Sequence, residues 1–388
     1  MSVVLPGGTV GILGGGQLGR MLSFEARRMG YRVCVLDPDP RCPTAQVADD
    51  CVAGALGDVA AALELADRVA VVTLDTEHVP AEVLEQIETK VPVRPSAAVL
   101  RTIQDRLGQK EFLARHGFPQ TKFRSVADAA ALPDALAAVG APAILKSRRA
   151  GYDGKGQARV EAGDDPVATF AKAGGVPAVL ESHVTFRTEI SVVLARSAQG
   201  EFQVYPIAEN VHRRHILHTT RVPARIETAV AAKAEQTARD IAEALGHIGV
   251  MAVEMFLLDD GSLLVNEIAP RTHNSGHYTF GACATSQFEQ HVRAICGLPL
   301  GDPALLSPVV MVNLVGDLWR MGRPDWSTVL SDPHARLHLY GKAMAVEGRK
   351  MGHVLVLDRD TDAAMRRAEA ILTKLEDAAG LPPESRRT

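Results

Sequence analysis

The 388-residue sequence lacks long apolar runs, and it lacks an excess of basic residues. No stretch approaches the ~20 apolar residues of a membrane-spanning helix, and residues 1–8 lack the basic and apolar regions of an export signal. Lys and Arg total 42 against 46 Asp and Glu, a net charge of -4 that gives no strong basic field for nucleic acid. We therefore expect a soluble protein whose partners are small molecules, with no nucleic acid and no membrane.

Cysteine is also scarce. The five cysteines include no C-x-x-C pair, and their odd number suits a reducing compartment better than a disulfide framework. We therefore expect a cytoplasmic protein. The cysteines are Cys34, Cys42, Cys51, Cys283 and Cys296.

The chain is long enough for two or three domains of roughly 100 to 200 residues each. The sequence predicts an apolar strand at residues 9–13, a glycine turn at 14–19, a helix at 17–29 and a second strand at 31–36. A strand at residues 69–74 and an amphipathic helix at 81–88 continue this α/β pattern. Such alternation predicts an open parallel sheet. Pro92 and Pro95 resist both helix and central strand and mark the end of this domain. An α+β pattern follows.

The first glycine turn, Gly14 to Gly19, satisfies G-x-G-x-x-G between a strand and a helix, and Asp37 ends the next strand. This spacing is typical of dinucleotide-binding proteins, in which the acid binds a ribose. Exposed amides at a helix start bind any phosphate, however, so a phosphorylated substrate near Gln17 and Leu18 fits equally well. A third interpretation is that the glycines only make a tight turn.

Two carboxylates are predicted to face each other on a β-hairpin. Asp260-Gly261 lies between two apolar runs and predicts a two-residue turn. That turn pairs Glu254 with Glu267, and like charges about 5 Å apart destabilise a ladder unless a cation lies between them. Oxygen ligands at this spacing suit a Mg²⁺ ion that also carries nucleotide phosphates; a solvated strand face is the alternative. Asn266 would need a bend in the strand to join them.

A second glycine loop follows a short strand that ends on Lys146. Without an external ligand, its glycines make it too flexible for regular structure. Its amides could close over phosphates while Lys146 supplies a point charge. G-x-x-x-x-G-K-[ST] is absent, so this is not a Walker loop, and an unordered surface hairpin is the alternative. The loop is Gly151-Tyr152-Asp153-Gly154-Lys155-Gly156-Gln157.

The chain resembles the ATP-grasp superfamily over nearly its whole length. The resemblance rests on the order of Lys146, the second glycine loop, Glu181-Ser182-His183-Val184, Glu189, Glu254 and Asn266-Glu267. Three motifs, at residues 16–20, 151–157 and 266–277, are similar to those of the 5-(carboxyamino)imidazole ribonucleotide synthase family.

This resemblance implies an ATP-grasp fold of mixed α/β and α+β class. Residues 1–98 would form an N-terminal pre-ATP-grasp domain with an open parallel sheet. Residues 99–296 would form the ATP-grasp region, with a small lid at about 110–185 and a larger carboxylate core at about 186–296. Residues 297–388 would form a small C-terminal domain that packs on the core.

The resemblance also implies a set of ATP-binding residues, with residues 181–184 beside adenine and Glu189 on the ribose. Glu254 and Glu267 would hold Mg²⁺, with a pair of ions expected. The implied ATP-binding residues are Arg106, Lys146, Gly151, Tyr152, Asp153, Gly154, Lys155, Gly156, Gln157, Glu181, Ser182, His183, Val184, Glu189, His212, Asn266 and Glu267.

The implied activity is ATP- and bicarbonate-dependent carboxylation of the exocyclic amine of 5-aminoimidazole ribonucleotide, through carboxyphosphate, in purine biosynthesis. Arg271 suits a bidentate grip on bicarbonate or phosphate oxygens, and His273 and Asn274 would contact bicarbonate or the imidazole. Asp153 is the candidate base for the amine proton. Further substrate-binding candidates are Gln17, Leu18, Glu77, Arg349 and Lys350.

Other interpretations stay open. His273 and His277 are four apart like helical zinc ligands, but the intervening Gly276 and the missing H-E-x-x-H glutamate argue against zinc. Another ATP-grasp ligase, such as a formate-dependent glycinamide ribonucleotide transformylase, would share the hairpin. An NAD-dependent oxidoreductase would use Gly14 to Gly19, and a catalytically silent nucleotide-binding scaffold is a third class. The resemblance implies a homodimer, and transient contact with a downstream mutase is a further hypothesis.

Overall fold

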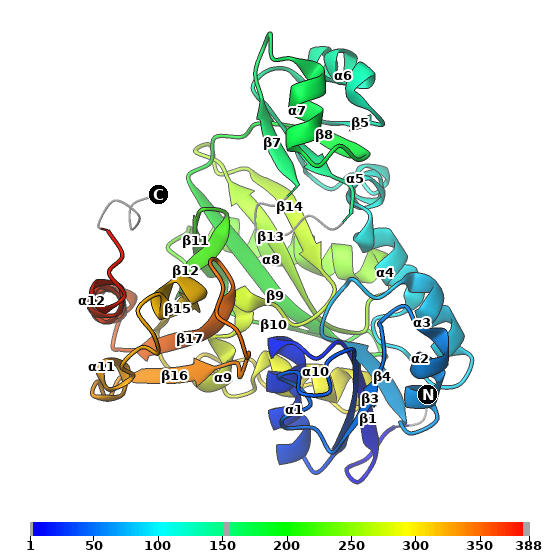
Figure 1. Cartoon of the computed structure of the whole chain (residues 1–388), viewed down its shortest axis with the longest axis vertical. Coiled ribbons are helices and arrows are strands. Elements are labelled where there is room, and N and C mark those ends of the chain that lie inside the picture. Colours follow the sequence, from blue (N-terminus) through cyan, green and yellow to red (C-terminus); the bar gives the residue numbers. More distant parts are fainter. Residues whose placement is uncertain (1–2, 150–155, 383–388) are drawn as a thin grey trace.

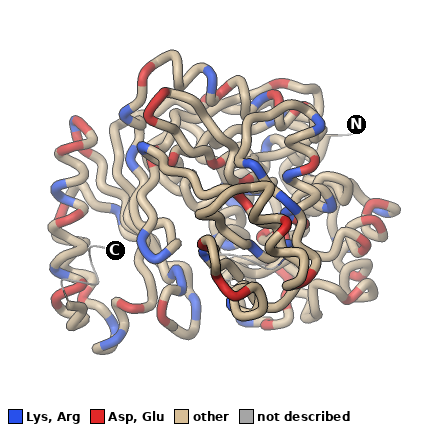
Figure 2. Tube along the Cα trace, turned by 90° about the horizontal axis from the view of Figure 1, so that it is seen from above, with Lys and Arg blue, Asp and Glu red and all other residues tan. Residues whose placement is uncertain are grey.

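The computed structural model describes residues 3–149 and 156–382. Within these residues, three sheets follow one another along the long axis of the molecule, with the four-stranded N-terminal sheet at one end, a second four-stranded sheet at the other and a nine-stranded sheet between them (Figure 1). Acidic and basic residues are interspersed along the chain (Figure 2). No helix of the described part has the length and apolarity that crossing a membrane requires.

The predicted N-terminal parallel sheet is confirmed. Its strand order is β3-β2-β1-β4, and each neighbouring pair is parallel. Apolar side chains pack on both faces, which is typical of a parallel sheet covered by helices. The strands are β1 (Thr9–Leu13), β2 (Arg32–Asp37), β3 (Asp50–Ala53) and β4 (Val71–Leu74), and the helices are α1 (Gln17–Arg28), α2 (Val59–Ala66), α3 (Ala81–Glu88) and α4 (Ala97–Gln104).

A small antiparallel sheet, in the order β5-β8-β6-β7, lies at the far end of the molecule (Figure 1). Apolar side chains of residues 131–139 and 170–173 pack on one cluster that includes Leu145 and Leu180. Its elements are α5 (Arg106–Arg115), β5 (Phe123–Val126), η1 (Ala129–Ala131), α6 (Leu132–Val139), β6 (Ala143–Ser147), β7 (Gln157–Val160), α7 (Pro166–Lys172) and β8 (Ala178–Ser182).

The large central sheet runs in the order β14-β13-β9-β11-β12-β15-β17-β16, with β10 also paired to β9. The long helix α8 packs on β9 and β13 and buries one face of the sheet. The elements up to residue 296 are β9 (Thr188–Arg196), β10 (Phe202–Val204), β11 (Ala208–Arg213), β12 (Ile216–Val222), α8 (Thr228–Ala244), β13 (Gly249–Leu257), β14 (Leu263–Ala269), η2 (Asn274–Gly276), α9 (Thr279–Ala282) and α10 (Gln287–Cys296).

The C-terminal segment continues this sheet, because β15 pairs with β12 and then with β17. The segment also has its own apolar cluster, in which α12 packs on β15 and β17. The domain limits at residues 98 and 296 stay predictions. The C-terminal elements are β15 (Val309–Val315), η3 (Gly316–Trp319), α11 (Ser327–Leu330), β16 (Ala335–Leu339), β17 (Lys350–Leu357) and α12 (Thr361–Ala378).

Helix α10 joins the N-terminal and central sheets. Phe288 and Val292 pack in the same apolar cluster as Val10 and Ile12 of β1. The buried His291 accepts a hydrogen bond from the Val250 backbone amide at Nδ1 (2.9 Å), and its Nε2 lies 2.7 Å from the Thr73 hydroxyl of β4. This shared core fixes the N-terminal domain against the central domain.

Candidate active site

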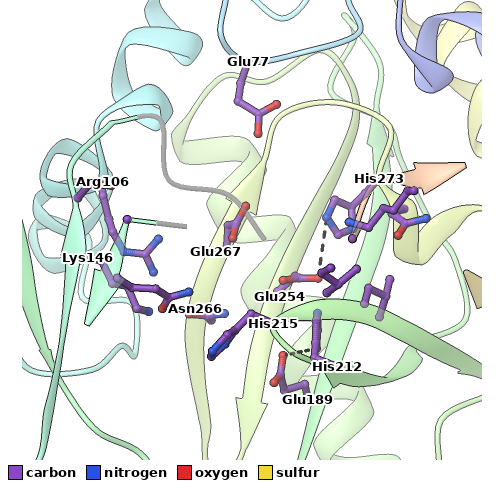
Figure 3. Close-up of a pocket in the computed structure, with 18 of the residues that line it drawn as sticks. Glu77, Arg106, Lys146, Glu189, His212, His215, Glu254, Asn266, Glu267 and His273 are labelled. Atoms are coloured by element: carbon purple, nitrogen blue, oxygen red, sulfur yellow. Dashed lines mark ion pairs between the residues drawn. The ribbon is translucent and has the colours of Figure 1, made fainter. Parts of the chain in front are cut away.

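A cavity of about 990 Å³ lies between the three sheets. Charged side chains point into it from separate elements, with Glu254 and Glu267 on the central sheet and Arg106 and Lys146 opposite them (Figure 3). Every predicted site residue in the described range lines this cavity: Gln17, Leu18, Glu77, Arg106, Lys146, Gly156, Gln157, Glu181, Ser182, His183, Val184, Glu189, His212, Glu254, Asn266, Glu267, Arg271, His273, Asn274, Arg349 and Lys350. Gly151, Tyr152, Asp153, Gly154 and Lys155 lie outside the described residues.

The turn between β13 and β14 differs from the prediction. The Leu258 amide donates to the Ser262 carbonyl (2.9 Å), and the Gly261 amide donates to the Leu258 carbonyl (3.1 Å). Gly261 has a φ of 80°, in the left-handed region that glycine favours. Residues 259–261 therefore form a three-residue loop, and the predicted two-residue turn at Asp260-Gly261 is wrong.

A β-bulge nevertheless brings the two carboxylates opposite each other. Next to the turn, Met255 lies opposite Val265, one residue away from the predicted register. The register then shifts, so Glu254 lies opposite Glu267, and that predicted pairing is confirmed. Asn266 is the extra residue of the bulge. The bend that Asn266 needed to join the cavity is therefore present.

The paired acids have the electrostatics of a cation site. Burial raises the pKa of Glu254 to about 7, and the neighbouring charge of Glu267 adds to this effect. The Oδ1 atom of Asn266 is buried, with no hydrogen-bond partner among the described residues. A hard divalent cation such as Mg²⁺ fits these oxygen donors, because it would neutralise both carboxylates and accept the amide oxygen as a ligand.

A cluster of cations surrounds the buried carboxylate of Glu181. Arg106 Nε lies 2.6 Å from one oxygen, and the ammonium groups of Lys110 and Lys146 lie 3.0 and 3.5 Å from the other. Thr121 also donates to Glu181 (3.0 Å). The three cations hold the pKa of Glu181 well below its ordinary value, against the opposing effect of burial. The cluster leaves an excess of positive charge beside the cavity.

The Glu181 side chain is thus committed to these ion pairs, and any contact of residues 181–184 with adenine would come from the following residues or the backbone. Lys146 is held less tightly than Lys110, and its pKa is lowered to about 8 by burial and by the neighbouring Arg106. An aromatic pair, Phe186 and Phe256, stacks in the cavity wall with ring centroids 4.6 Å apart. This pair offers an apolar surface near residues 181–184.

Glu189 and His212 form a second charged pair in the cavity. His212 Nδ1 lies 3.1 Å from Glu189 Oε2, on the neighbouring strands β11 and β9 (Figure 3). Burial would lower the pKa of His212, but the Glu189 carboxylate more than offsets burial, so this pKa is raised. The pair presents polar groups next to Glu254 on the same sheet.

Arg271 and Glu77 form a bidentate ion pair across two domains. Arg271 Nη2 donates to Glu77 Oε1 at 2.7 Å, and Arg271 Nε donates to the other oxygen. Burial would raise the pKa of Glu77, but Arg271 overrides this effect and lowers it to about 2. The pair fixes the loop after β14 against the N-terminal domain, and an anion bound by Arg271 would share its guanidinium with Glu77.

Asn274 is held by a partner that the sequence did not reveal. Its Nδ2 donates to Asn313 Oδ1 (3.1 Å), and Asn313 Nδ2 donates back to Asn274 Oδ1 (2.7 Å). Both side chains are buried. This amide pair links β15 to the loop that carries Arg271 and His273, while direct contact of Asn274 with a substrate stays a prediction.

In the first glycine turn, two backbone amides are already hydrogen-bonded to aspartate side chains of the protein. Asp37 Oδ2 accepts the Gly15 amide (2.7 Å), and Asp75 Oδ1 accepts the Gly19 amide (2.6 Å). A Cβ at Gly15 would overlap Cys42. Asp37 therefore caps the turn and is not placed to bind a ribose, which argues against the dinucleotide interpretation.

The basic candidates Arg349 and Lys350 lie at the start of β17, where Arg349 precedes the strand and Lys350 is its first residue. Arg349 is exposed and donates to the Met344 carbonyl (3.1 Å). The half-buried Lys350 has its own carbonyl bonded by Lys342 (2.7 Å). Both line the cavity, and their contact with a ribose phosphate stays a prediction.

Sequence reasoning missed several residues of the site. Asp75 follows β4 directly and could have been recognised by the same strand-end rule that selected Asp37. Lys110 lies one helical turn after Arg106, which places both on one face of α5. His215, which also lines the cavity, lies in the two-residue turn between β11 and β12. No local pattern marks Asn313, because its position depends on the pairing of β15 with the distant β17.

Comparisons with known proteins agree with this geometry. Residues 8–104 match the ribonucleotide synthetase preATP-grasp domain, residues 111–288 the ATP-grasp domain, and residues 309–367 the phosphoribosylaminoimidazole carboxylase C-terminal domain. An N5-carboxyaminoimidazole ribonucleotide synthase from Brucella melitensis is 46% identical over 351 residues, which cover 90% of this chain and 96% of the relative.

Solved structures give the same result. The ADP complex of an N5-carboxyaminoimidazole ribonucleotide synthetase has a TM-score of 0.91 and 40% identity, and covers 98% of this chain and 100% of its own. The Aspergillus clavatus N5-carboxyaminoimidazole synthase, in complex with ADP and 5-aminoimidazole ribonucleotide, has a TM-score of 0.87 and 35% identity, and covers 95% of this chain and 99% of its own.

A pre-ATP-grasp sheet, a lid sheet and a carboxylate-bearing central sheet around one cavity define an ATP-grasp enzyme, an ATP-dependent ligase. The chain belongs to the N5-carboxyaminoimidazole ribonucleotide synthase family.

Proposed function

We propose that this chain carboxylates the exocyclic amine of 5-aminoimidazole ribonucleotide in de novo purine biosynthesis. The reaction consumes ATP and bicarbonate and gives 5-carboxyaminoimidazole ribonucleotide, ADP and phosphate. The observation that carries the proposal is the pairing of Glu254 with Glu267 in a cavity that also contains the Arg271–Glu77 pair. A family relative with this fold binds ADP and 5-aminoimidazole ribonucleotide.

Nucleotide binding is assigned to the side of the cavity next to the small sheet. Arg106 and Lys146 supply positive charge to the phosphates. With a pKa of about 8, Lys146 is mostly protonated at neutral pH and retains its charge. Glu189 and His212 contact the ribose from β9 and β11, and Phe186 and Phe256 supply apolar surface for the base.

The paired acids are assigned to metal binding. Mg²⁺ held by Glu254 and Glu267, with Asn266 Oδ1 beside them, would neutralise phosphate charge in the transition state. The high pKa of Glu254 supports this assignment, because a protonated acid at the position would lose its proton in exchange for a cation.

Carboxyl transfer then takes place in two steps. A bicarbonate oxygen attacks the γ-phosphorus of ATP, the bond to ADP breaks, and carboxyphosphate forms. The amine attacks the carboxyl carbon of carboxyphosphate, or of the CO₂ released from it, while phosphate departs and the amine loses a proton. Arg271 grips the bicarbonate oxygens with the guanidinium edge that Glu77 orients. Asp153 is the proposed base, on the family resemblance alone.

The C-terminal part of the cavity is assigned to the ribose phosphate. Arg349 and Lys350 approach from β17, and Gln17 and Leu18 approach from the start of α1. We further propose a cytoplasmic homodimer that contacts the downstream mutase transiently, which the family resemblance supports. Sedimentation of the protein alone and mixed with that mutase tests both associations.

Release of phosphate from MgATP tests the activity. We expect release only when bicarbonate and 5-aminoimidazole ribonucleotide are both present, and we expect ¹³C from labelled bicarbonate in the product. Release that instead requires formate and glycinamide ribonucleotide would assign the chain to the alternative ligase. Removal of either substrate from the complete mixture is the matched control.

A further inference from the structure

A chain of buried polar side chains runs under the cavity and ends on His273. It crosses β12, β11 and β9 on the face that carries Glu254, because Ser191 of β9 lies directly opposite Glu254 in the ladder. Its other members are Thr220, Asn210 and Ser275, and all four side chains are buried. None of them was predicted from the sequence.

The chain is continuous at hydrogen-bond distances. The Thr220 hydroxyl lies 3.0 Å from Asn210 Oδ1, Asn210 Nδ2 lies 2.9 Å from Ser191 Oγ, and Ser191 Oγ lies 2.7 Å from Ser275 Oγ. The Ser275 hydroxyl lies 2.8 Å from Nδ1 of His273. The polar groups therefore link Thr220 of the central sheet to the imidazole of His273 in the cavity wall.

The direction of the chain follows from groups that can only donate. The backbone amide of Ser275 donates to His273 Nδ1 (3.3 Å), so Nδ1 carries no proton. At the other end, Asn210 Nδ2 can only donate, so the Ser191 hydroxyl passes its own proton to Ser275 Oγ. Ser275 is then left with a hydroxyl proton for His273 Nδ1. Every bond runs toward the imidazole.

The backbone of His273 is held as firmly as its ring. Gln287 of α10 accepts the His273 amide at Oε1 (2.9 Å) and donates from Nε2 to the His273 carbonyl (2.8 Å). A neutral imidazole has one N–H, so with Nδ1 an acceptor the proton is on Nε2. That atom faces the cavity, 3.9 Å from Glu254 Oε1, too far for a hydrogen bond.

We propose that Thr220, Asn210, Ser191 and Ser275 are positioning residues that fix His273 as the neutral Nε2–H tautomer, a hydrogen-bond donor aimed at the reacting carboxyl group. The identity of that ligand rests on the proposed carboxylation, whereas the tautomer does not. A donor held in advance stabilises negative charge that develops on oxygen during transfer. The assignment also means that His273 does not act as a base.

Long-range ¹H–¹⁵N NMR of the ¹⁵N-histidine-labelled full chain tests the tautomer directly. Comparison with His273→Gln assigns the signal. We expect one protonated nitrogen, Nε2, in the protein alone and with MgADP. A protonated Nδ1, or a mixture of both tautomers, in the wild-type protein overturns the proposal. This measurement does not depend on turnover, so a failure of the tautomer proposal can be distinguished from a failure of the carboxylation assay.

Two substitutions at Thr220, the member of the hydrogen-bonded series farthest from His273, distinguish the effect of the hydroxyl from the effect of side-chain packing. Thr220→Val removes the hydroxyl and keeps the shape, whereas Thr220→Ser keeps the hydroxyl and loses a methyl group. We expect Thr220→Val to broaden or mix the His273 tautomer signal and to lower kcat about tenfold at unchanged KM for ATP. Thr220→Ser should keep the wild-type signal. Equal effects of Thr220→Val and Thr220→Ser on the tautomer signal and on kcat, or larger effects of Thr220→Ser, would refute the proposed role of this hydrogen-bonded series.

Ser275→Ala tests the last link, and Ser197→Ala is its matched control. Ser197 is equally buried, but it serves the β9–β10 turn by accepting the Glu201 amide. We expect Ser275→Ala to lower kcat at unchanged KM for ATP and Ser197→Ala to leave kcat unchanged. An unchanged kcat in Ser275→Ala, with an unchanged tautomer signal, would contradict the proposal. Circular dichroism of each variant identifies any that fail to fold, and the wild-type spectrum remains decisive.

Discussion

Glu254 of β13 lies directly opposite Glu267 of β14, immediately before the register of the two strands shifts at Asn266. Two like charges at such a ladder position oppose pairing of the strands. The bulge keeps the two carboxylates opposite each other, and its extra residue, Asn266, adds an amide oxygen beside them.

Replacing Glu267 with Gln should abolish turnover without unfolding the protein. The change removes one of the two proposed metal ligands while preserving shape, and we expect kcat to fall about a thousandfold. Phosphate release from MgATP measures the effect. The matched control is Glu243→Gln on the exposed face of α8, which should retain wild-type kcat. Activity of Glu267→Gln within a factor of a few of wild type would remove Glu267 from the metal site.

The metal-free protein should lose stability as the pH rises from about 4.5 to about 7. The folded-state pKa of Glu254, about 7, exceeds its ordinary value of 4.5. The unfolded chain therefore releases this proton first as the pH rises, which favours unfolding until the folded state is ionised as well. Urea unfolding in EDTA across this range measures the slope. Glu254→Gln should flatten it, and an equal slope in the variant would contradict the assignment.

Replacing Glu77 with Gln should lower the stability of the protein and raise its KM for bicarbonate. We expect the free energy of unfolding to fall by about 1–3 kcal/mol, because Arg271 would keep its largely buried charge without a carboxylate partner. The pKa of Glu77 is lowered to about 2, so this contribution is present above about pH 4.5 and disappears as the pH falls toward 2. Urea unfolding and the KM for bicarbonate measure the two effects. Glu85→Gln, in an exposed pair with Arg101, should cost under about 1 kcal/mol.

Replacing Lys110 with Met should weaken ADP binding although Lys110 does not line the cavity. With Lys110 gone, Lys146 is drawn toward Glu181, to which it already lies within 3.5 Å, and away from the phosphates. We expect affinity for ADP to fall several-fold and stability to fall by about 1–3 kcal/mol. Calorimetric titration with ADP measures the binding. Lys172→Met at the end of α7 is exposed and should change neither quantity.

Local sequence patterns predicted the elements well and the turn poorly. The strand at residues 9–13 and the helix at residues 81–88 have the predicted bounds, because apolar periodicity and flanking glycine or proline determine both. An Asp-Gly pair, in contrast, suits both a two-residue turn and the last two residues of a three-residue loop. The predicted pairing of Glu254 with Glu267 was correct because the bulge at Asn266 compensates for the longer loop.

The long-range parts of the site could not be predicted from local patterns. Glu181 collects Arg106, Lys110 and Lys146 from separate elements, and only the folded sheet brings them together. Asp37 lies where a ribose-binding acid is expected, yet its carboxylate accepts the Gly15 amide instead. The described residues that the family resemblance selected line one cavity, but the resemblance did not reveal the partners that orient them.

The continuation of the central sheet into β15 and β17 has a practical consequence for shortening the chain. A polypeptide ending near residue 296 would leave the amides and carbonyls of β12 at a bare sheet edge, where they now bond to β15. Such an edge recruits strands from other molecules. Truncated versions should therefore precipitate or form fibres, and tags or fusion partners are better attached beyond α12.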